Sequence, residues 1–204
     1  IYRPYKPKKK TRATVAKAKG LEPLADIIME QKETKPIEEI AKAFVTNVEE
    51  GENNTEKDKI VANVEEAIAG ALDIIAENIS DNPTYRKKIK GICYREAVMN
   101  VKATKPEEKS SYDMYYDFNE SIRRLPSHRI LAINRGEKED FLKVKIDKPE
   151  EKIISLMERD ILKGHTQFET YLKSAIEDSW KRLIEPSIDR EIRSDLTEKA
   201  EEKA

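Results

Sequence analysis

The sequence has little of the chemistry that most metal sites and small-molecule enzymes need. Among its 204 residues it contains a single cysteine, Cys93, which excludes a disulfide framework and a cysteine-rich metal site. Its six glycines are scattered singly, so no glycine-rich phosphate loop occurs. The two histidines, His128 and His165, are far from each other and from Cys93, and none shows metal-ligand spacing. We therefore expect neither a metal nor a cofactor.

Long hydrophobic runs are also missing. No apolar stretch approaches the roughly 18 residues of a membrane span, and no signal peptide is visible. We therefore expect a cytoplasmic protein with no membrane contact. The chain starts at Ile1 without a methionine and stops inside a helical pattern at Ala204, so we expect a piece of a longer protein.

Charge is plentiful and unevenly placed. Charged residues make up 39% of the chain, and the formal net charge is only −1. Residues 1–20 nevertheless contain eight basic residues and no acidic one, whereas the remaining chain has 31 basic and 40 acidic residues. A basic end on an acidic body predicts a polyanion contact at that end.

Five cations of this end are candidates for contact with RNA or DNA, because cations pair with phosphates and release counterions. They are Lys6, Lys8, Lys9, Lys10 and Arg12. Pro4 and Pro7 keep the segment extended. The pattern leaves an alternative open, in which the run is a solvated surface or pairs with the acidic body.

The apolar residues mostly recur at helical spacing, which predicts a mainly α, multi-helical scaffold. Ile37, Ile40 and Phe44 begin one apolar stripe, and a longer one runs over 61–79. We divide the chain into three parts. These are a basic segment with a short helix at 1–20, a helical domain at 21–163 and further helices at 164–204.

The pattern changes between residues 125 and 146. Two short apolar runs, 130–133 and 141–146, flank the turn-forming residues 134–136. The second run alternates apolar and charged residues, which is typical of a half-buried strand. The sequence therefore predicts one small β-hairpin near residues 129–146 as the only substantial β-structure.

Two other combinations invite a functional interpretation. Ser127 beside His128 could suggest a nucleophile and its base, but neighbours on a strand point to opposite faces and no orienting third group follows. The aromatic residues between 112 and 118 could stack on RNA bases. Acidic residues interleave with them, so packing in a core between helices is favoured. We therefore predict no enzymatic site.

Four stretches resemble the Tex family of bacterial transcription accessory proteins. They read PYKPKKKTRATVAKAKGLEPLA at 4–25, VEEAIAGALDIIAENISDNPTYRKKI at 64–89, PSHRILAINRGEKE at 126–139 and LIEPSIDREIRSDLTEKAEEKA at 183–204. They span the chain in order, whereas residues 91–104 match the family poorly.

The resemblance implies a helical region with a small β-hairpin that precedes an RNase H-like (YqgF-type) domain. Intact members also contain helix-hairpin-helix modules and a C-terminal OB-fold RNA-binding domain, and they look similar to a eukaryotic elongation factor that binds RNA polymerase and histones. We expect a helical scaffold in a transcription accessory protein that binds RNA or DNA in its intact form. The alternative is a protein-interaction module that contacts RNA polymerase or associated proteins. A nuclease component would need clustered carboxylates, which acids on helix faces do not predict.

Overall fold

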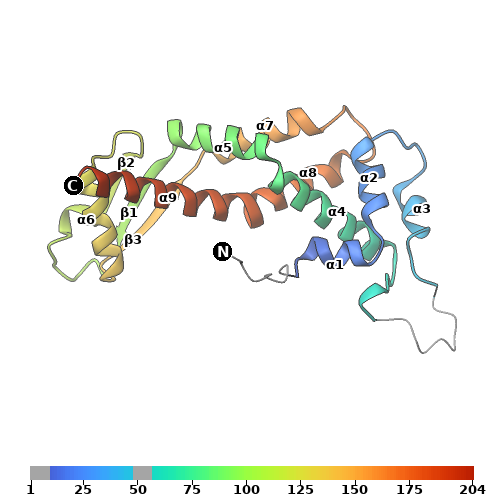
Figure 1. Ribbon diagram of the computed structural model, residues 1–204, viewed down its shortest axis with the longest axis horizontal. Coiled ribbons are helices and arrows are strands. Elements are labelled where there is room, and N and C mark those ends of the chain that lie inside the picture. Colours follow the sequence, from blue (N-terminus) through green and yellow to red (C-terminus); the bar gives the residue numbers. More distant parts are fainter. Residues whose placement is uncertain (1–9, 48–56) are drawn as a thin grey trace, which may run out of the picture. The chain divides into compact units, whose positions relative to one another are not determined.

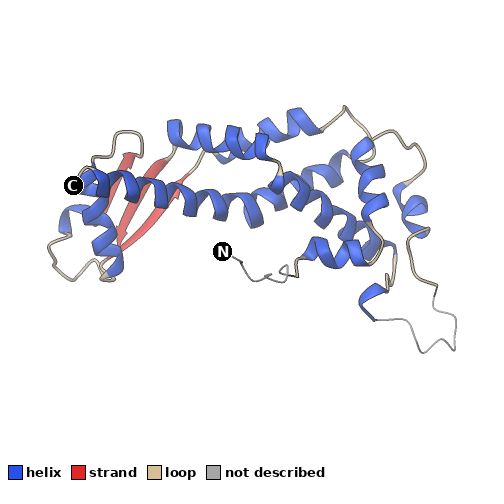
Figure 2. Ribbon diagram, in the orientation of Figure 1, coloured by secondary structure: helices blue, strands red, loops and turns tan. Residues whose placement is uncertain are grey.

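The computed structural model describes residues 10–47 and 57–204, and it confirms a mainly helical protein with one small sheet (Figure 2). The helices are α1 (Arg12–Ala18), α2 (Glu22–Glu30), α3 (Ile37–Lys42), α4 (Val64–Asp81), α5 (Pro83–Glu96), α6 (Ser127–Lys138), α7 (Glu150–Ile161), α8 (Glu169–Asp178) and α9 (Glu185–Glu202). Single 3₁₀ turns lie at Lys57–Lys59 and Asp113–Tyr115, and a π-helical stretch, η3 (Ser179–Ile184), joins α8 to α9. The strands are β1 (Val98–Ala103), β2 (Asp117–Ser121) and β3 (Leu142–Asp147).

The described residues form two compact units, and each unit combines segments that are distant in sequence. The first unit joins the described residues up to Asp81 with Met157–Trp180, and the second joins Asn82–Leu156 with Lys181–Ala204. The threefold division at residues 20 and 163 stays a prediction about the order of parts along the chain. Among the described residues, no helix is both long and apolar enough to cross a membrane.

In the first unit, α1 lies against α4, and the ends of α1 are fixed by local hydrogen bonds. The Thr11 hydroxyl caps the helix by accepting from the Thr14 amide at 3.1 Å. The Thr14 hydroxyl in turn accepts from the Thr11 amide at 2.8 Å. Gly20 ends it in the left-handed conformation, at φ 76°. A side chain on Gly70 of α4 would lie 2.4 Å from Leu21, so glycine permits the close approach of these segments.

Two glutamine side chains tie the first part of this unit to its second part through backbone groups. Gln31 is buried, donates to the Ile161 carbonyl at 2.9 Å and accepts from the Lys163 amide at 2.9 Å. Gln167 donates to the carbonyls of residues 33 and 35 and accepts from the Ile37 amide at 3.0 Å. These bonds satisfy polar backbone groups in loops that lack a regular ladder.

The second unit contains an antiparallel sheet of strand order β2-β1-β3. Its apolar face is built from residues that the register places side by side, such as Met99 with Ile146 and Val101 with both Phe118 and Val144. Helix α6 contacts β3 beside this sheet (Figure 1). The opposite face carries polar and charged side chains, among them the exposed Lys102, Asn119 and Lys145.

The predicted hairpin at 129–146 is wrong in its first half and right in its second. Leu142–Asp147 is a strand as predicted, but Ser127–Lys138 is the helix α6. Strand β3 pairs with β1 and not with the segment that precedes β3 in the sequence. The turn lies later than predicted, where Asp140 adopts φ 63° and the Phe141 amide donates to the Gly136 carbonyl at 2.8 Å.

Gly136 gave the misleading turn signal, and its role is close packing. It is a buried helical residue, and a side chain there would lie 2.5 Å from Cδ1 of Leu142. Two residues after the end of α6, the left-handed Asp140 reverses the chain, so β3 returns directly across the helix. The glycine therefore serves a helix–strand contact and not a hairpin turn.

Candidate nucleic-acid interface

Of the five cations predicted to contact nucleic acid, two lie in the described part of the chain. Lys10 precedes the cap of α1 and Arg12 is its first residue, and both side chains are exposed. Neither makes an ion pair within residues 10–47 and 57–204. Lys6, Lys8 and Lys9 lie outside the described residues, so their contact with phosphate stays a prediction.

One nearby cation does pair with the body. Lys19, next to the end of α1, contacts Glu66 of α4 at 2.7 Å. The hydrogen bond from Lys19, followed by the one from the Ala62 amide, lowers the pKa of the Glu66 carboxyl. Pairing with acidic residues therefore occurs at Lys19, while Lys10 and Arg12 remain open to solvent.

The sequence analysis missed a second cationic surface, on α5. This helix has five basic residues, Arg86, Lys87, Lys88, Lys90 and Arg95. Arg86 and Lys90 face α9: Arg86 donates to Ser187 at 2.8 Å, and Lys90 contacts Glu191 at 2.7 Å and Asp195 at 3.2 Å. The hydrogen bond with Glu191 leads the interactions that raise the pKa of Lys90.

The other three cations line a shallow groove. Lys87, Lys88 and Arg95 are exposed and make no ion pair within the described ranges. The groove has a volume of about 720 Å³, and Thr84, Ile92 and Leu156 also line it. None of its lining residues is acidic. The run of basic residues at 86–90 was the signal in the sequence that could have identified this surface.

Tyr94 strengthens the contact of α5 with α9. Its phenol donates to the Asp195 carboxylate, and the ammonium groups of Lys90 and Lys199 lie 5.9 Å and 5.7 Å from the centre of its ring. Burial first, and then the bond to Asp195, raise the pKa of Tyr94. The same bond lowers the pKa of Asp195. Both shifts favour a neutral phenol that donates to an ionised carboxylate.

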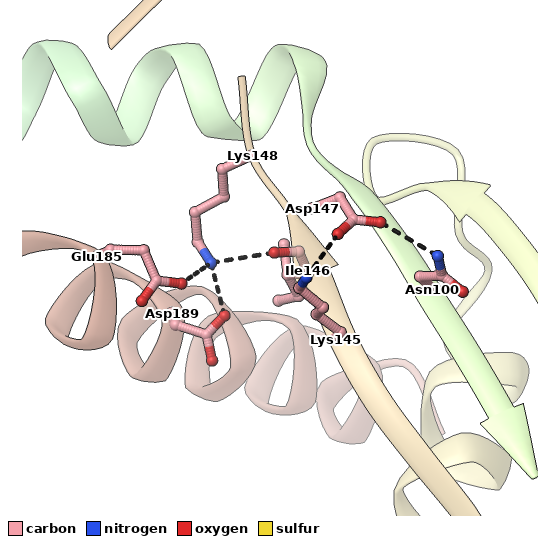
Figure 3. Close-up of polar contacts among 7 residues, drawn as sticks. All are labelled: Asn100, Lys145, Ile146, Asp147, Lys148, Glu185 and Asp189. Carbon is pink, nitrogen blue, oxygen red and sulfur yellow. Dashed lines mark hydrogen bonds and ion pairs between the residues drawn. The ribbon is translucent and has the colours of Figure 1, made fainter. Parts of the chain in front are cut away.

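A buried lysine ties the end of β3 to α9 (Figure 3). The Lys148 side chain is only 3% exposed, and its ammonium contacts Glu185 and Asp189, each at 2.7 Å. It also donates to the Ile146 carbonyl at 3.1 Å, so all three of its hydrogens have acceptors. Burial alone lowers the pKa of Lys148, but the bonds to Asp189 and Glu185 outweigh it and raise the pKa.

The residues considered for catalysis do not form a constellation. Ser127 and His128 both lie at the start of α6, where His128 is exposed. Burial raises the pKa of Cys93 to about 11, so its thiol stays protonated at neutral pH. Within the described residues, no group of three or more His, Cys, Asp or Glu side chains is placed to hold a metal ion.

These features define a class of protein: mainly helical, with charged side chains bonded across its elements and exposed cations on the surface of its described residues. The chain belongs to the Tex family, because the model of the Tex central region-like family matches residues 31–204.

Named relatives agree with this membership. The chain is 46% identical to the uncharacterized protein YdcI of Bacillus subtilis, over 100% of the chain and 28% of that protein. It is 34% identical to protein tex of Bordetella pertussis, over 72% of the chain and 17% of that protein. It is 31% identical to S1 RNA-binding domain-containing protein 1 of Pongo abelii, over 66% of the chain and 14% of that protein. The chain thus spans little more than a quarter, at most, of these relatives' length.

Proposed function

We propose that this chain is the helical scaffold of a Tex-type transcription accessory protein that binds RNA or DNA and acts in the cytoplasm beside RNA polymerase. The relatives' names support this proposal. A related Neisseria gonorrhoeae protein is called transcriptional accessory protein Tex, and the Pongo abelii relative is named for an S1 RNA-binding domain. We propose a structural role for the chain and no catalysis.

The observation that carries the scaffold role is the use of the charged groups with shifted pKa. Lys148, Lys90 and Asp195 are each bonded across two elements, so their shifts come from contacts that hold α9 to β3 and α5. A catalytic group needs a shifted pKa at a position that a substrate can reach, whereas the Lys148 side chain is only 3% exposed. In the described residues, every buried side-chain nitrogen or oxygen atom has a hydrogen-bond partner. Such complete satisfaction suits a rigid support.

The proposed direct contribution to binding is weak and comes from the basic N-terminal stretch. Contact of its five cations with phosphates gives a log–log salt slope of about −3 to −5, depending on whether the nucleic acid is single- or double-stranded. Such a contact is not sequence-specific, because phosphates carry no sequence information.

The test compares this chain with the intact protein in binding labelled RNA and DNA at low and physiological salt. The intact protein should bind tightly under both conditions, and the chain should bind weakly and only at low salt. Equal affinity of the two would contradict the scaffold role. A chain that binds no nucleic acid at low salt would favour the alternative, a module that contacts the transcription machinery through protein alone.

A further inference from the structure

We propose that the α5 groove is a second contact site, which binds the backbone of a single-stranded nucleic acid. The inference rests on the proposed nucleic-acid function and extends it to residues that the sequence analysis did not single out. The site consists of Lys87, Lys88 and Arg95 on one face of α5, above a floor formed by Ile92 and Leu156.

The division of the α5 cations is the first argument. Arg86 and Lys90 project toward α9 and are bonded there, whereas Lys87, Lys88 and Arg95 project into the groove and have no acidic partner among the residues described. Beyond residue 20 the chain has more acidic than basic residues, so three unopposed cations on one face run against its average charge. They produce a local positive potential that attracts a polyanion.

The spacing of these cations suits a phosphate chain. Lys87 and Arg95 are eight residues apart, which is about 12 Å along a helix axis. Lys88 and Arg95 are about two turns apart and so lie on the same side of α5, and Lys87 lines the groove beside them. A ligand that lies along the groove therefore meets cations at both ends. The regularly spaced negative charges of a nucleic-acid backbone suit this arrangement.

The hydrogen-bonding chemistry favours nucleic acid over peptide. Lys87, Lys88 and Arg95 can only donate, and no carboxylate lines the groove to accept from a ligand. A phosphodiester offers acceptors at every unit. A peptide would bring backbone N–H donors that find few acceptors here.

The apolar floor favours a single strand over a duplex. Gly91 leaves the groove open, since a side chain there would reach within 3.4 Å of the Arg95 guanidinium. Ile92 and Leu156 can then contact an unstacked base or a sugar, whereas a duplex keeps its bases stacked inside and presents phosphates.

The test measures fluorescence anisotropy of a labelled 12-nucleotide oligo(U) with the 204-residue chain between 25 and 200 mM salt. The groove variant replaces Lys87, Lys88 and Arg95 by glutamine. A matched control replaces Arg123, Arg124 and Lys143, which are also exposed residues of the second unit, by glutamine. Circular dichroism and urea denaturation verify that both variants fold.

The groove variant should reduce the steepness of the salt slope by about 2, at roughly 0.7 per lost phosphate contact, and the control should leave it near the original value. Gly91→Leu keeps every charge and fills the groove. It should weaken oligo(U) binding by about tenfold with an unchanged slope, because the floor and not the charge is lost.

Several results would overturn the proposal. These are equal slopes for the groove variant and the control, tighter binding of a 12-base-pair duplex that Gly91→Leu leaves unaffected, and displacement of oligo(U) by polyglutamate of equal charge as readily as by unlabelled oligo(U). A Lys10→Gln, Arg12→Gln double variant separates this site from the N-terminal contact. Loss of binding in the double variant alone would sustain the N-terminal contact and reject the groove, whereas loss in the groove variant alone would sustain the groove and reject the N-terminal contact.

Discussion

Tyr94 on α5 donates its phenol hydrogen to the carboxylate of Asp195 on α9, and the bond links two helices about 100 residues apart in the sequence. The bond shifts the pKa of its two members in opposite directions. It therefore predicts how the stability of the second unit depends on pH at both ends of the scale.

At acid pH the titration of the Asp195 carboxylate determines how stability changes. The hydrogen bond from Tyr94, opposed by burial and assisted by Lys90, lowers the pKa of Asp195. Below about pH 4 the unfolded chain binds this proton more readily than the folded one, so stability falls as pH decreases toward the lowered pKa. At alkaline pH the raised pKa of Tyr94 acts, and stability falls as pH rises above about 10, where the unfolded tyrosine ionises first.

The measurement is urea denaturation of the chain between pH 3 and pH 11, with unfolding monitored by circular dichroism. Tyr94→Phe should flatten the dependence at both ends, because it removes the donor and the titrating phenol together. A Tyr94→Phe profile that runs parallel to that of the original chain would show that this bond does not set the pH dependence.

Gly136→Ala should destabilise the second unit by about 1–3 kcal/mol, a typical cost of overpacking. The added Cβ would lie 2.5 Å from Cδ1 and 2.8 Å from Cγ of Leu142, which is fully buried. Gly91→Ala is the matched control on α5, where the nearest atom is 3.4 Å away. It should stabilise by about 0.5–1 kcal/mol through helix propensity. Equal effects of the two in urea denaturation would refute the proposed packing role of Gly136.

Lys148→Met should destabilise the chain by about 1–3 kcal/mol. It leaves Glu185 and Asp189 without their shared cation, but both carboxylates are 37% exposed and keep part of their hydration, so the full cost of a buried charge is not reached. Adding Glu185→Gln and Asp189→Asn to Lys148→Met should recover part of the loss. If the triple variant is less stable than the single one, repulsion between the stranded carboxylates is not the cause.

Gln31→Ala should cost about 1–3 kcal/mol, because the Ile161 carbonyl and the Lys163 amide lose their partner in a buried position. Gln31→Gly removes the same bonds but relieves the left-handed backbone, at φ 57°. The glycine variant should therefore be the more stable of the two, by about 1 kcal/mol. Identical thermal unfolding of the two variants would show that the backbone conformation carries no strain.

The parts of the fold that local chemistry determines were predictable from the sequence. Thr11 and Gly20 bound α1, and Asn82 with Pro83 begins α5, where the Asn82 side chain accepts from the Thr84 amide at 2.9 Å. These signals act over a few residues and need no tertiary partner.

The sheet was harder to predict, because its strands depend on partners. β1 alternates between buried Met99, buried Val101 and polar neighbours, but it follows α5 directly and reads as the end of a helix. β2 has one large apolar residue, Phe118, which packs edge-to-face on Tyr115 with ring centres 5.3 Å apart. Its strand conformation comes from pairing with β1, which local propensity does not reveal.

The cationic residues were likewise only partly predictable from the sequence. An excess of charge at residues 1–20 is visible in a count, so Lys10 and Arg12 could be identified at once. The α5 cations lie within ten residues of one another, and only the side chains of α9 separate the bonded pair from the three that line the groove. A partner 100 residues away is not visible in a local pattern.

The interleaving of the two units has a consequence for synthesis on the ribosome. The chain passes from one unit to the other at residues 81–82, 156–157 and 180–181, so the first unit needs Trp180 before it is complete. The second unit needs the α9 residues Glu185, Asp189 and Asp195, which are translated after every partner that they bond. Helices α1–α7 therefore emerge before either unit can close, and the second unit closes only when α9 follows them.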